Sequence, residues 1–455
     1  MTQTSSKLDI AVLPYHHDSS ILFASLKHLD AAVYLDSSAP YSKQGRYDLI
    51  SAEPIELLTR TSANYTVDGE CFFDEIKKHL DDCDFITGNP LQLPFIGGAI
   101  GYFNYDLGRE IEKLPEKAEQ DVLLPDAIVG IYDWAIIVDH EKQATTMVMQ
   151  PTMKLALKEN ILRLLQQPAL NTSHFSLNES FQSNMSKADY KYAFNQSHQY
   201  IHAGDCYQIN LAQRFSAAYQ GDSWQAYKRL RKTAGAPYSA YLRYDNAEIL
   251  SFSPEQFIQL RHGQVSTAPI KGTRVRGSNK NQDNILANEL IHSKKDQAEN
   301  LMIVDLLRND LGKTCIPGSI KVDKLFELQS FETVHHLVST ISGALDKQYH
   351  ACDLLATCFP GGSITGAPKI RAMEIIEELE PHRRSIYCGS IAYISFDGQM
   401  DSNITIRTVL ANNNKLHCWS GGGLVADSSC EAEYKESLQK VDKLLQALGN
   451  EPLIE

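Results

Sequence analysis

The sequence predicts an α+β fold. Residues 247–274 read as successive β-strands, whereas residues 294–312 and 430–449 show the apolar periodicity of amphipathic helices. Strands and helices are interspersed along the chain without the regular alternation of a parallel, doubly wound sheet. The chain has 455 residues, of which 43% are hydrophobic and 22% charged, so it has ample apolar material for a large core.

The sequence divides into two regions. Residues 8–165 mix short β-like segments with helix-like ones, and residues 187–447 contain nearly every unusual motif. Between them, residues 168–186 are polar and rich in Ser and Asn, which is typical of a linker. We therefore expect one boundary near Ser186.

Individual elements follow from alternating or helical apolar patterns, and from Gly and Pro at their ends. Pro368 stands early in its helix, where the missing N–H does no harm. In chain order we expect a hairpin over 127–150 with its turn near 139–142, a helix over 152–167, a helix over 187–205 closed by Gly204, a strand over 206–219, strands over 247–274, and helices over 294–312, 366–384 and 430–449.

Charge and composition narrow the class of partner. The formal net charge is −13, which argues against nucleic acid or an anionic membrane as a partner. No apolar run approaches membrane-spanning length, and the first ten residues lack the features of a signal peptide, so a cytoplasmic location is expected. The nine cysteines form no C-x-x-C pair, and none lies in a G-x-C-x-G elbow. We therefore expect inert thiols and no cysteine-dependent glutaminase within this chain.

Three acidic residues are candidate metal ligands. Glu433 and Glu436 share one face of the last predicted helix, and Glu299 lies on another helix. Acidic residues on helices are usually solvated, whereas three converging carboxylates would suit Mg²⁺. The sequence alone leaves both readings open.

Two glycine-rich loops are candidate anion sites. The spacing of Gly361–Gly366 resembles a P-loop, but Ala367 and Pro368 stand where a P-loop needs Lys and Ser or Thr. Either this loop or Gly421–Gly423 could still present backbone N–H groups to an anion, although a tight turn is the simpler interpretation. Arg407 in a predicted strand adds a group that can bind a carboxylate with two hydrogen bonds.

Taken alone, two further residues carry no clear signal. Lys271 lies between Ile270 and Gly272 and reads as a surface charge, and His336 beside an apolar run reads as a core histidine.

Together, these segments resemble the chorismate-utilising enzymes, over nearly the whole chain. The resemblance implies a large two-sheet β-sandwich with helices on the outside, in which both regions contribute strands and the site lies between the sheets. The matching segments are "YLDSSAPYSKQGRYDLISAEP", "LPFIGGAIGYFNYDLGR", "LPDAIVGIYDWAIIVDH", "GDCYQINLAQRF", "SPEQF", "PIKGTR", "DQAENLMIVDLLRNDLG", "VHHLVSTISG", "FPGGSITGAPKIRAMEIIEELEP", "GSIAYIS", "ITIRT" and "GGGLVADS…EAEYKES".

The resemblance gives Lys271 a chemical role. Family members that make anthranilate carry "PIAGT", whereas those that make 4-amino-4-deoxychorismate, for 4-aminobenzoate and folate, carry "PIKGT" as here. In the latter group the lysine is thought to add to C2 of chorismate, and Glu255 matches the acid that protonates the leaving 4-hydroxyl. The lysine must be neutral near pH 7, so its pKa has to be lowered. A nearby positive charge would lower it. In an extended strand Arg274 points to the opposite face from Lys271, so bound Mg²⁺ is the better source of that charge.

The other roles are implied position by position. Glu299, Glu433 and Glu436 match the Mg²⁺ ligands of the family, and His336 matches an active-site histidine. Gln208 stands where isochorismate and salicylate synthases carry a water-activating lysine, so a hydration reaction is disfavoured. The residues matching those that hold the two carboxylates of chorismate are Thr365, Gly366, Tyr387, Arg407, Gly422 and Gly423.

The resemblance also implies partners. A tryptophan site would include Ser37, Pro237 and Tyr238, for which ordinary sheet packing is the competing explanation. The missing glutaminase elbow implies a separate glutamine amidotransferase that delivers ammonia. Two alternatives remain: anthranilate formation with pyruvate release, and a non-catalytic subunit that binds chorismate or tryptophan.

Overall fold

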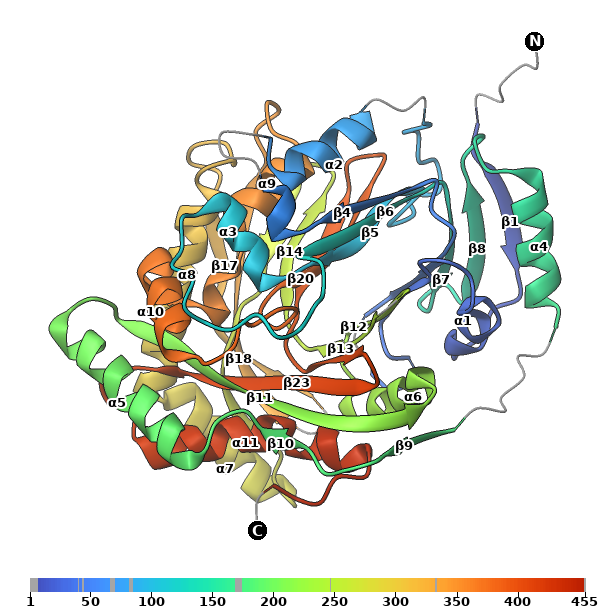
Figure 1. The fold of residues 1–455 in the computed structure, drawn as a ribbon. Helices are drawn as coiled ribbons and strands as arrows, with labels where there is room; N and C mark the ends of the chain where they lie inside the picture. The colour runs from blue at the N-terminus through green and yellow to red at the C-terminus, as the bar shows by residue number, and fades with distance from the viewer. Residues whose placement is uncertain are drawn as a thin grey trace.

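The computed structural model describes residues 7–39, 41–42, 45–65, 70–81, 85–167, 174–245, 247–331 and 334–453 (Figure 1). Two large sheets dominate it, with helices packed around them, which confirms the predicted α+β sandwich. Every strand pairing within the two sheets is antiparallel. No helix of the described part of the chain is long and apolar enough to cross a membrane.

The first sheet joins strands from both predicted regions. Its N-terminal strands lie together on one side and its C-terminal strands on the other, and they meet where β2 pairs with β12. In order across the sheet the strands are β1 (Asp9–Leu13), β8 (Ala144–Met149), β7 (Trp134–Asp139), β3 (Tyr47–Ser51), β2 (Val33–Asp36), β12 (Tyr238–Tyr244), β13 (Ala247–Ser253), β22 (Thr408–Asn412), β23 (Lys415–Leu424), β11 (Gln208–Gly221) and β10 (Gln182–Ser183), with β9 (Phe175–Leu177) and β19 (Gly366–Ala367) also paired to β11.

The second sheet has the same division. Here the N-terminal and C-terminal strands meet where β5 pairs with β20. In order the strands are β16 (Ile270–Val275), β18 (Val334–Ala344), β15 (Gln264–Thr267), β14 (Gln256–Arg261), β21 (Met400–Ile404), β20 (Ser390–Ser395), β5 (Gly98–Phe103), β6 (Ala127–Tyr132) and β4 (Glu56–Arg60), with β17 (Lys321–Ser330) paired to β18.

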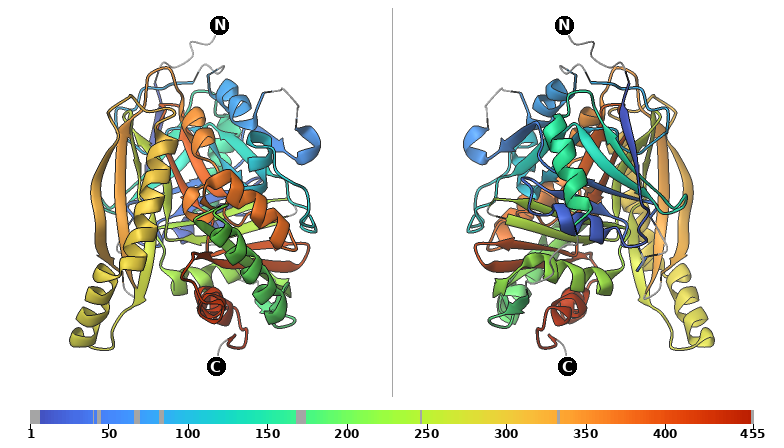
Figure 2. Two further views of the ribbon diagram at one scale, coloured as in Figure 1. Left: turned by 90° about the vertical axis from the view of Figure 1, so that its left-hand side faces the viewer. Right: turned by 90° about the vertical axis from the view of Figure 1, so that its right-hand side faces the viewer.

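Helices cover the outer faces. Helix α11 lies at the lower end of the molecule in Figure 1, and α4 faces the viewer in the right half of Figure 2. The helices are α1 (Ser20–Leu26), α2 (Phe72–Asp81), α3 (Gly108–Ile111), α4 (Leu155–Leu165), α5 (Lys187–Ala203), α6 (Ser223–Ala234), α7 (Lys280–His292), α8 (Lys294–Leu311), α9 (Ala351–Cys358), α10 (Lys369–Leu379) and α11 (Cys430–Ala447), with short 3-10 turns η1 (Ser62–Asn64), η2 (Tyr105–Leu107) and η3 (Gly362–Ile364).

The hairpin predicted over 127–150 has its turn in the expected place, but only the second half of the segment forms it. β7 and β8 pair across the expected turn, whereas the first half of the segment, β6, belongs to the second sheet. The chain crosses from one sheet to the other at Asp133, a single buried residue between β6 and β7. Apolar alternation is the same in both strands, so it does not reveal a change of sheet.

The predicted helices of the second region are confirmed, but the one expected over 366–384 is shorter: Gly366 and Ala367 form β19, and α10 covers Lys369–Leu379. α5 begins with a capping box in which Ser186 and Asp189 each bond the other's backbone N–H, and it ends at Gly204, whose φ of +86° suits glycine. The expected linker is only partly a connection. Residues 168–173 lie outside the described residues, and β9 and β10 in the remainder pair with β11. The domain boundary near Ser186 stays a prediction from the sequence.

The main apolar core lies between the sheets. It contains residues of both, such as Leu242 and Ile249 from the first sheet and Ile100 and Ile258 from the second. A second cluster packs the helices α1, α4, α6 and α11 against the first sheet, and a third packs α5 and α10 against Ile209 of β11. The eight cysteines in the described part of the chain are free thiols, and six of them are buried.

Candidate active site

Lys271 lies on β16, where the strand is irregular. The pairing of β16 with β18 shifts register between Ile270 and Thr273, and Gly272 inside that interval has a φ of +81°. A Cβ on Gly272 would come within 3.0 Å of the side chains of Leu290 and Asp296, so glycine allows α7 and α8 to pack against the strand. The Lys271 Nζ donates a hydrogen bond of 2.7 Å to the backbone carbonyl oxygen of Ser363.

Glu255 faces this lysine from a crossing point between the sheets. It lies between β13 of the first sheet and β14 of the second, and it is buried. Its carboxylate accepts hydrogen bonds from the Ser363 hydroxyl and the Ile270 backbone N–H. Burial raises the pKa of Glu255, against the opposing effects of the Lys271 charge and of these two bonds. The group is therefore biased toward the protonated form that a general acid needs.

The Lys271 amine has the opposite bias. Burial lowers its pKa, and the ammonium of Lys440 lowers it further, while the charges of Glu299, Glu255 and Glu436 oppose the shift. Arg274, as expected from strand geometry, lies elsewhere: its guanidinium pairs with Asp296 at 3.2 Å. The local positive neighbour is thus Lys440, which the sequence prediction did not include.

The three predicted metal ligands lie around this lysine. Glu299 is on α8, and Glu433 and Glu436 are on α11. Burial raises the pKa of Glu299, and the charge of Glu433 adds to that effect. Burial also acts to raise the pKa of Glu436, but Lys440 outweighs it and the net shift is downward. The three carboxylates therefore belong to one electrostatic cluster.

Two lysines neutralise these carboxylates in the structure. Lys295 Nζ lies 3.9 Å from Glu299 Oε1 and 3.5 Å from Glu433 Oε1, and Lys440 Nζ lies 2.9 Å from Glu436 Oε1. Among the described residues, no three His, Cys, Asp or Glu side chains are already grouped closely enough to hold a metal ion.

The donor set is nevertheless of the type that suits Mg²⁺, because it consists only of carboxylate oxygens. Gly422 borders these residues: a Cβ there would lie 3.1 Å from Glu433 Oε2, 3.8 Å from Lys440 Nζ and 4.0 Å from Glu436 Oε1. The residues thus fit Mg²⁺ in the chemistry of their donor atoms.

His336 and Arg407 form the opposite part of the site. His336 is buried on β18, and its Nδ1 lies 2.9 Å from Thr273 Oγ1. Burial lowers the pKa of His336 to about 3, and the nearby charge of Arg407 contributes. His336 is therefore neutral at physiological pH.

Arg407 is a cation that forms no ion pair within the described residues. It lies between β21 and β22, at a second crossing between the sheets, with a φ of +50°. This crossing is adjacent to that of Glu255, because β13 pairs with β22 and β14 with β21. Burial lowers its pKa, and within the described part of the chain no carboxylate contributes to that shift. A half-buried guanidinium in this state is suited to bind an anion.

The glycine-rich loop joins β11 directly. Gly366 on β19 pairs with Ile209, and a Cβ on Gly366 would lie 2.2 Å from the Gln208 carbonyl oxygen. The Thr365 carbonyl accepts a hydrogen bond from the Asn210 N–H at 2.9 Å. The Thr365 hydroxyl donates to the Gly361 carbonyl oxygen at 3.2 Å. The loop is therefore closely packed and fixed, which an exposed turn would not be.

Gln208 projects over the second glycine-rich strand. It is fully buried, and neither its Nε2 nor its Oε1 has a hydrogen-bond partner within the described residues. β11 pairs with β23 so that Asn210 lies opposite Gly423, and a Cβ on Gly423 would lie 2.4 Å from Gln208 Nε2. An unpaired buried amide is costly, so this one is placed to bond a polar ligand.

Tyr387 is held by aromatic and cation–π contacts. It is buried and stacks on Trp419 with ring centroids 6.5 Å apart, and the Arg384 guanidinium lies over its ring. Burial raises the pKa of its hydroxyl well above the usual value, so the hydroxyl remains a donor.

Sequence reasoning missed Ser363, Lys295 and Lys440. A signal existed for Lys440, because it stands four residues after Glu436 on the same helix and seven after Glu433. Ser363 gave none, since its contacts to Glu255 and Lys271 join segments that are far apart in the sequence.

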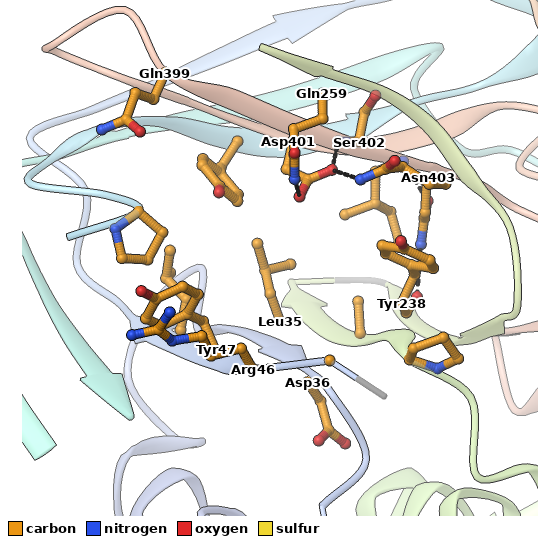
Figure 3. A pocket seen from close by; sticks show the side chains of 18 of the residues that line it. Leu35, Asp36, Arg46, Tyr47, Tyr238, Gln259, Gln399, Asp401, Ser402 and Asn403 are labelled. Carbon is orange, nitrogen blue, oxygen red and sulfur yellow. Dashed lines mark hydrogen bonds between the residues drawn. The ribbon is translucent and has the colours of Figure 1, made fainter. Parts of the chain in front are cut away.

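The residues predicted to bind tryptophan lie near a separate cavity of about 500 Å³ between the two sheets (Figure 3). Pro237 and Tyr238 line it, as do Leu35, Asp36 and Tyr47 of the first sheet and Gln259, Asp401, Ser402 and Asn403 of the second. Ser37 does not line the cavity. Its N–H and hydroxyl both donate to Asp48 Oδ1, at 2.7 and 2.6 Å, and it packs behind Gly45 at the cavity wall.

Among the described residues, Asp401 is one of two carboxylates that line this cavity, the other being Asp36. It accepts hydrogen bonds from the side-chain amides of Gln256 and Gln259, at 3.0 and 2.7 Å (Figure 3). Burial raises its pKa, against these bonds and the charge of Arg261.

Comparisons with known proteins match the whole chain. A family model described as chorismate binding enzyme matches residues 32–446. Aminodeoxychorismate synthase component 1 of Salmonella typhimurium is 47% identical over 97% of this chain and 98% of that protein, and the protein of the same name from Escherichia coli is 46% identical over 98% and 99%. The crystal structure of anthranilate synthase component I from Streptococcus pneumoniae superposes with a TM-score of 0.79 and 29% identity, covering 89% of this chain and 93% of that one.

Proposed function

Since this chain belongs to the family of chorismate-binding enzymes, we propose that it is an aminodeoxychorismate synthase component 1. It converts chorismate and ammonia to 4-amino-4-deoxychorismate, in the 4-aminobenzoate branch of folate biosynthesis. The observation that carries the proposal is the pairing of Lys271 with Glu255, in which burial favours a neutral amine and a protonated carboxyl group in one enclosed site.

The first step forms a covalent adduct. The neutral Lys271 Nζ attacks C2 of chorismate, the two ring double bonds shift, and the C4–O bond breaks. Glu255 gives its proton to the departing hydroxide, which leaves as water, and the new secondary ammonium loses a proton.

The second step restores the lysine. Ammonia attacks C4, the double bonds shift back, and the C2–N bond to Lys271 breaks. A proton from the incoming nitrogen passes to the leaving amine, so Lys271 returns neutral. The net reaction consumes one chorismate and one ammonia and releases one water, an amino-group transfer.

The remaining residues hold the substrate. Arg407, which has no ion-pair partner among the described residues, is suited to bind one carboxylate of chorismate, with backbone N–H groups of the Thr365 and Gly423 segments for the rest. His336 is neutral and can donate or accept one hydrogen bond near the reacting ring. Gln208 offers an amide and no base, which supports amination over hydration.

Glu299, Glu433 and Glu436 would hold Mg²⁺. When bound, the ion would neutralise the ring carboxylate and replace the charges of Lys295 and Lys440 beside these residues.

Ammonia is proposed to come from a separate glutamine amidotransferase subunit. The name component 1 of the relatives supports a second component, and this sequence has no G-x-C-x-G elbow for a glutaminase of its own. A cytoplasmic location remains a prediction from composition. The cavity at Pro237 and Tyr238 is large enough for an aromatic amino acid, and tryptophan is the proposed ligand.

Anthranilate synthesis is the alternative, favoured by the similarity to the streptococcal anthranilate synthase component I. It would release pyruvate and would not need Lys271. A purely regulatory subunit would have no use for the Lys271–Glu255 pair.

A product assay decides among them. The purified chain is incubated with chorismate, Mg²⁺ and ammonium at mildly alkaline pH, and products are separated and identified by mass. Aminodeoxychorismate without pyruvate is expected. Anthranilate with pyruvate would overturn the proposal in favour of the alternative, and unchanged chorismate in the presence of an added glutaminase subunit and glutamine would overturn both.

A further inference from the structure

Ser363 makes two hydrogen bonds to the two reactive groups of the proposed site. Its backbone carbonyl accepts from Lys271 Nζ at 2.7 Å, and its hydroxyl donates to the Glu255 carboxylate. Glu255 also accepts from the N–H of Ile270, the residue just before Lys271. These contacts close a ring through three segments: the crossing between β13 and β14, the strand β16, and the turn η3.

Rings of this kind fix relative positions. Each contact alone would leave a side chain free to rotate, but a carboxylate held by two donors and an amine held by one acceptor have few arrangements left. The ring includes both the proposed nucleophile and the proposed acid, and Ser363 is the member that contacts both of them.

The turn that carries Ser363 is itself rigid. Ser363 is buried, and a Cβ on the neighbouring Gly362 would lie 2.3 Å from Leu306 Cδ2 of α8. The Ile364 carbonyl accepts a hydrogen bond from the buried guanidinium of Arg384 at 3.1 Å, and the same guanidinium bonds the carbonyl of Asn210 on β11. The loop therefore presents Ser363 from a fixed backbone.

We propose that Ser363 is a positioning residue of this reaction, whose hydroxyl orients the Glu255 carboxyl group toward the substrate while its carbonyl orients the Lys271 amine. This inference rests on the proposed function. Ser363 forms and breaks no covalent bond in this scheme and acts through Glu255 and Lys271.

The hydroxyl can be removed without removing the carbonyl. Ser363→Ala deletes the donor to Glu255, whereas Ser363→Thr retains a hydroxyl on the same backbone. Glu255 becomes charged as it gives up its proton, and hydrogen bonds to charged groups are among the stronger ones, so we expect Ser363→Ala to lower kcat roughly 10- to 100-fold with little change in the KM for chorismate. Ser363→Thr should recover most of that loss.

A double-mutant cycle with Glu255→Gln separates positioning from general damage. If Ser363 acts through Glu255, Ser363→Ala should lower kcat by less than about threefold when Glu255 is already Gln, because the group it orients is gone. Four chains are needed: the native one, each single variant and the double variant. All are measured with chorismate, Mg²⁺ and saturating ammonium, and circular dichroism with thermal unfolding checks each fold.

The outcomes are distinct. A kcat loss in Ser363→Ala that Thr recovers and that disappears in the Glu255→Gln background supports the inference. A native rate in Ser363→Ala, or an equal loss in both backgrounds, overturns it. If Thr does not fit the buried site, the cycle alone decides. Failure of the proposed function would be seen instead as no aminodeoxychorismate from the native chain.

Discussion

The side-chain amide of Gln208 occupies the space where a Cβ of Gly423 would stand, 2.4 Å from its Nε2. Glycine at position 423 therefore leaves the room that the Gln208 amide occupies. This amide is fully buried and has no hydrogen-bond partner among the described residues. The two residues are 215 positions apart in the numbering and meet only because β11 and β23 pair with Asn210 opposite Gly423.

Gly423→Ala should accordingly impair substrate binding. The new methyl group displaces the Gln208 amide toward the substrate site, so we expect the KM for chorismate to rise about tenfold or more with a smaller effect on kcat. Steady-state kinetics measures this. The matched control is Gly88→Ala, whose Cβ would meet no atom within 4 Å and whose backbone needs no positive φ. An unchanged KM in Gly423→Ala would show that the amide does not limit binding.

Lys271→Ala should abolish most aminodeoxychorismate formation while the fold is kept. Removal of the nucleophile eliminates the adduct, and a loss of about 10³-fold or more in kcat is expected. The exposed Lys347 serves as a control, because its replacement by Ala changes the same type of charge outside the site. Mass spectrometry of the native chain quenched during turnover should detect the adduct on Lys271. A fully active variant would eliminate the nucleophile role.

Glu436→Ala should abolish Mg²⁺-dependent turnover. Its carboxylate lies beside Glu433 at Gly422, and its loss removes one of three proposed oxygen ligands. Calorimetric titration of Mg²⁺ into the chain gives a readout that does not depend on activity, and weaker binding is expected. Glu431 is the matched control, since it lies on the same helix and forms an exposed ion pair with Lys187. Normal Mg²⁺ affinity and dependence in Glu436→Ala would contradict the ligand role.

His336 should make the protein less stable in mild acid. Its pKa is about 3 in the fold, below the ordinary value near 6.5 in an unfolded chain, so below pH 6.5 the unfolded state binds a proton that the native state does not. Its contribution to stability is complete above pH 6.5 and falls by about 1.4 kcal/mol per pH unit toward pH 3.

Urea unfolding at several pH values tests this. Between pH 6.5 and 4, the free energy of unfolding of His336→Gln should depend on pH less steeply than that of the native chain, by the equivalent of one proton. The pKa of His417 is about 4, so His417→Gln should show the same change over a shorter pH range. Identical slopes in the native and His336→Gln chains would mean that His336 is protonated in the fold.

Local sequence patterns predict individual helices and strands well, but they do not predict which strands pair in each sheet. Gly204 and the capping residues of α5 act within a few positions, so the sequence states them directly. The two adjacent crossings that carry Glu255 and Arg407 depend on which strands pair in two different sheets, and no local signal carries that. The change of sheet at Asp133 was missed for the same reason.

The chemistry of the site shows the same limit. Taken alone, Lys271 read as a surface charge, and only the family resemblance gave it a role. Its partners Ser363 and Lys440 come from segments about 90 and 170 residues away, and their effect on the amine follows from burial that a single sequence does not display. Ser37 shows the converse: the motif placed it near the cavity, but its hydroxyl is directed to Asp48.

The two seams at which N-terminal and C-terminal strands meet constrain how the chain is made. β2 pairs with β12, and β5 with β20, so a nascent chain that has emerged only as far as residue 186 leaves both inner edges open. Open strand edges recruit other chains, and contacts between distant segments form slowly. β2 can pair once β12 (Tyr238–Tyr244) has emerged, whereas β5 must wait for β20 (Ser390–Ser395), so the N-terminal strands of the second sheet keep an open edge for longest and are the part of this chain most in need of chaperones.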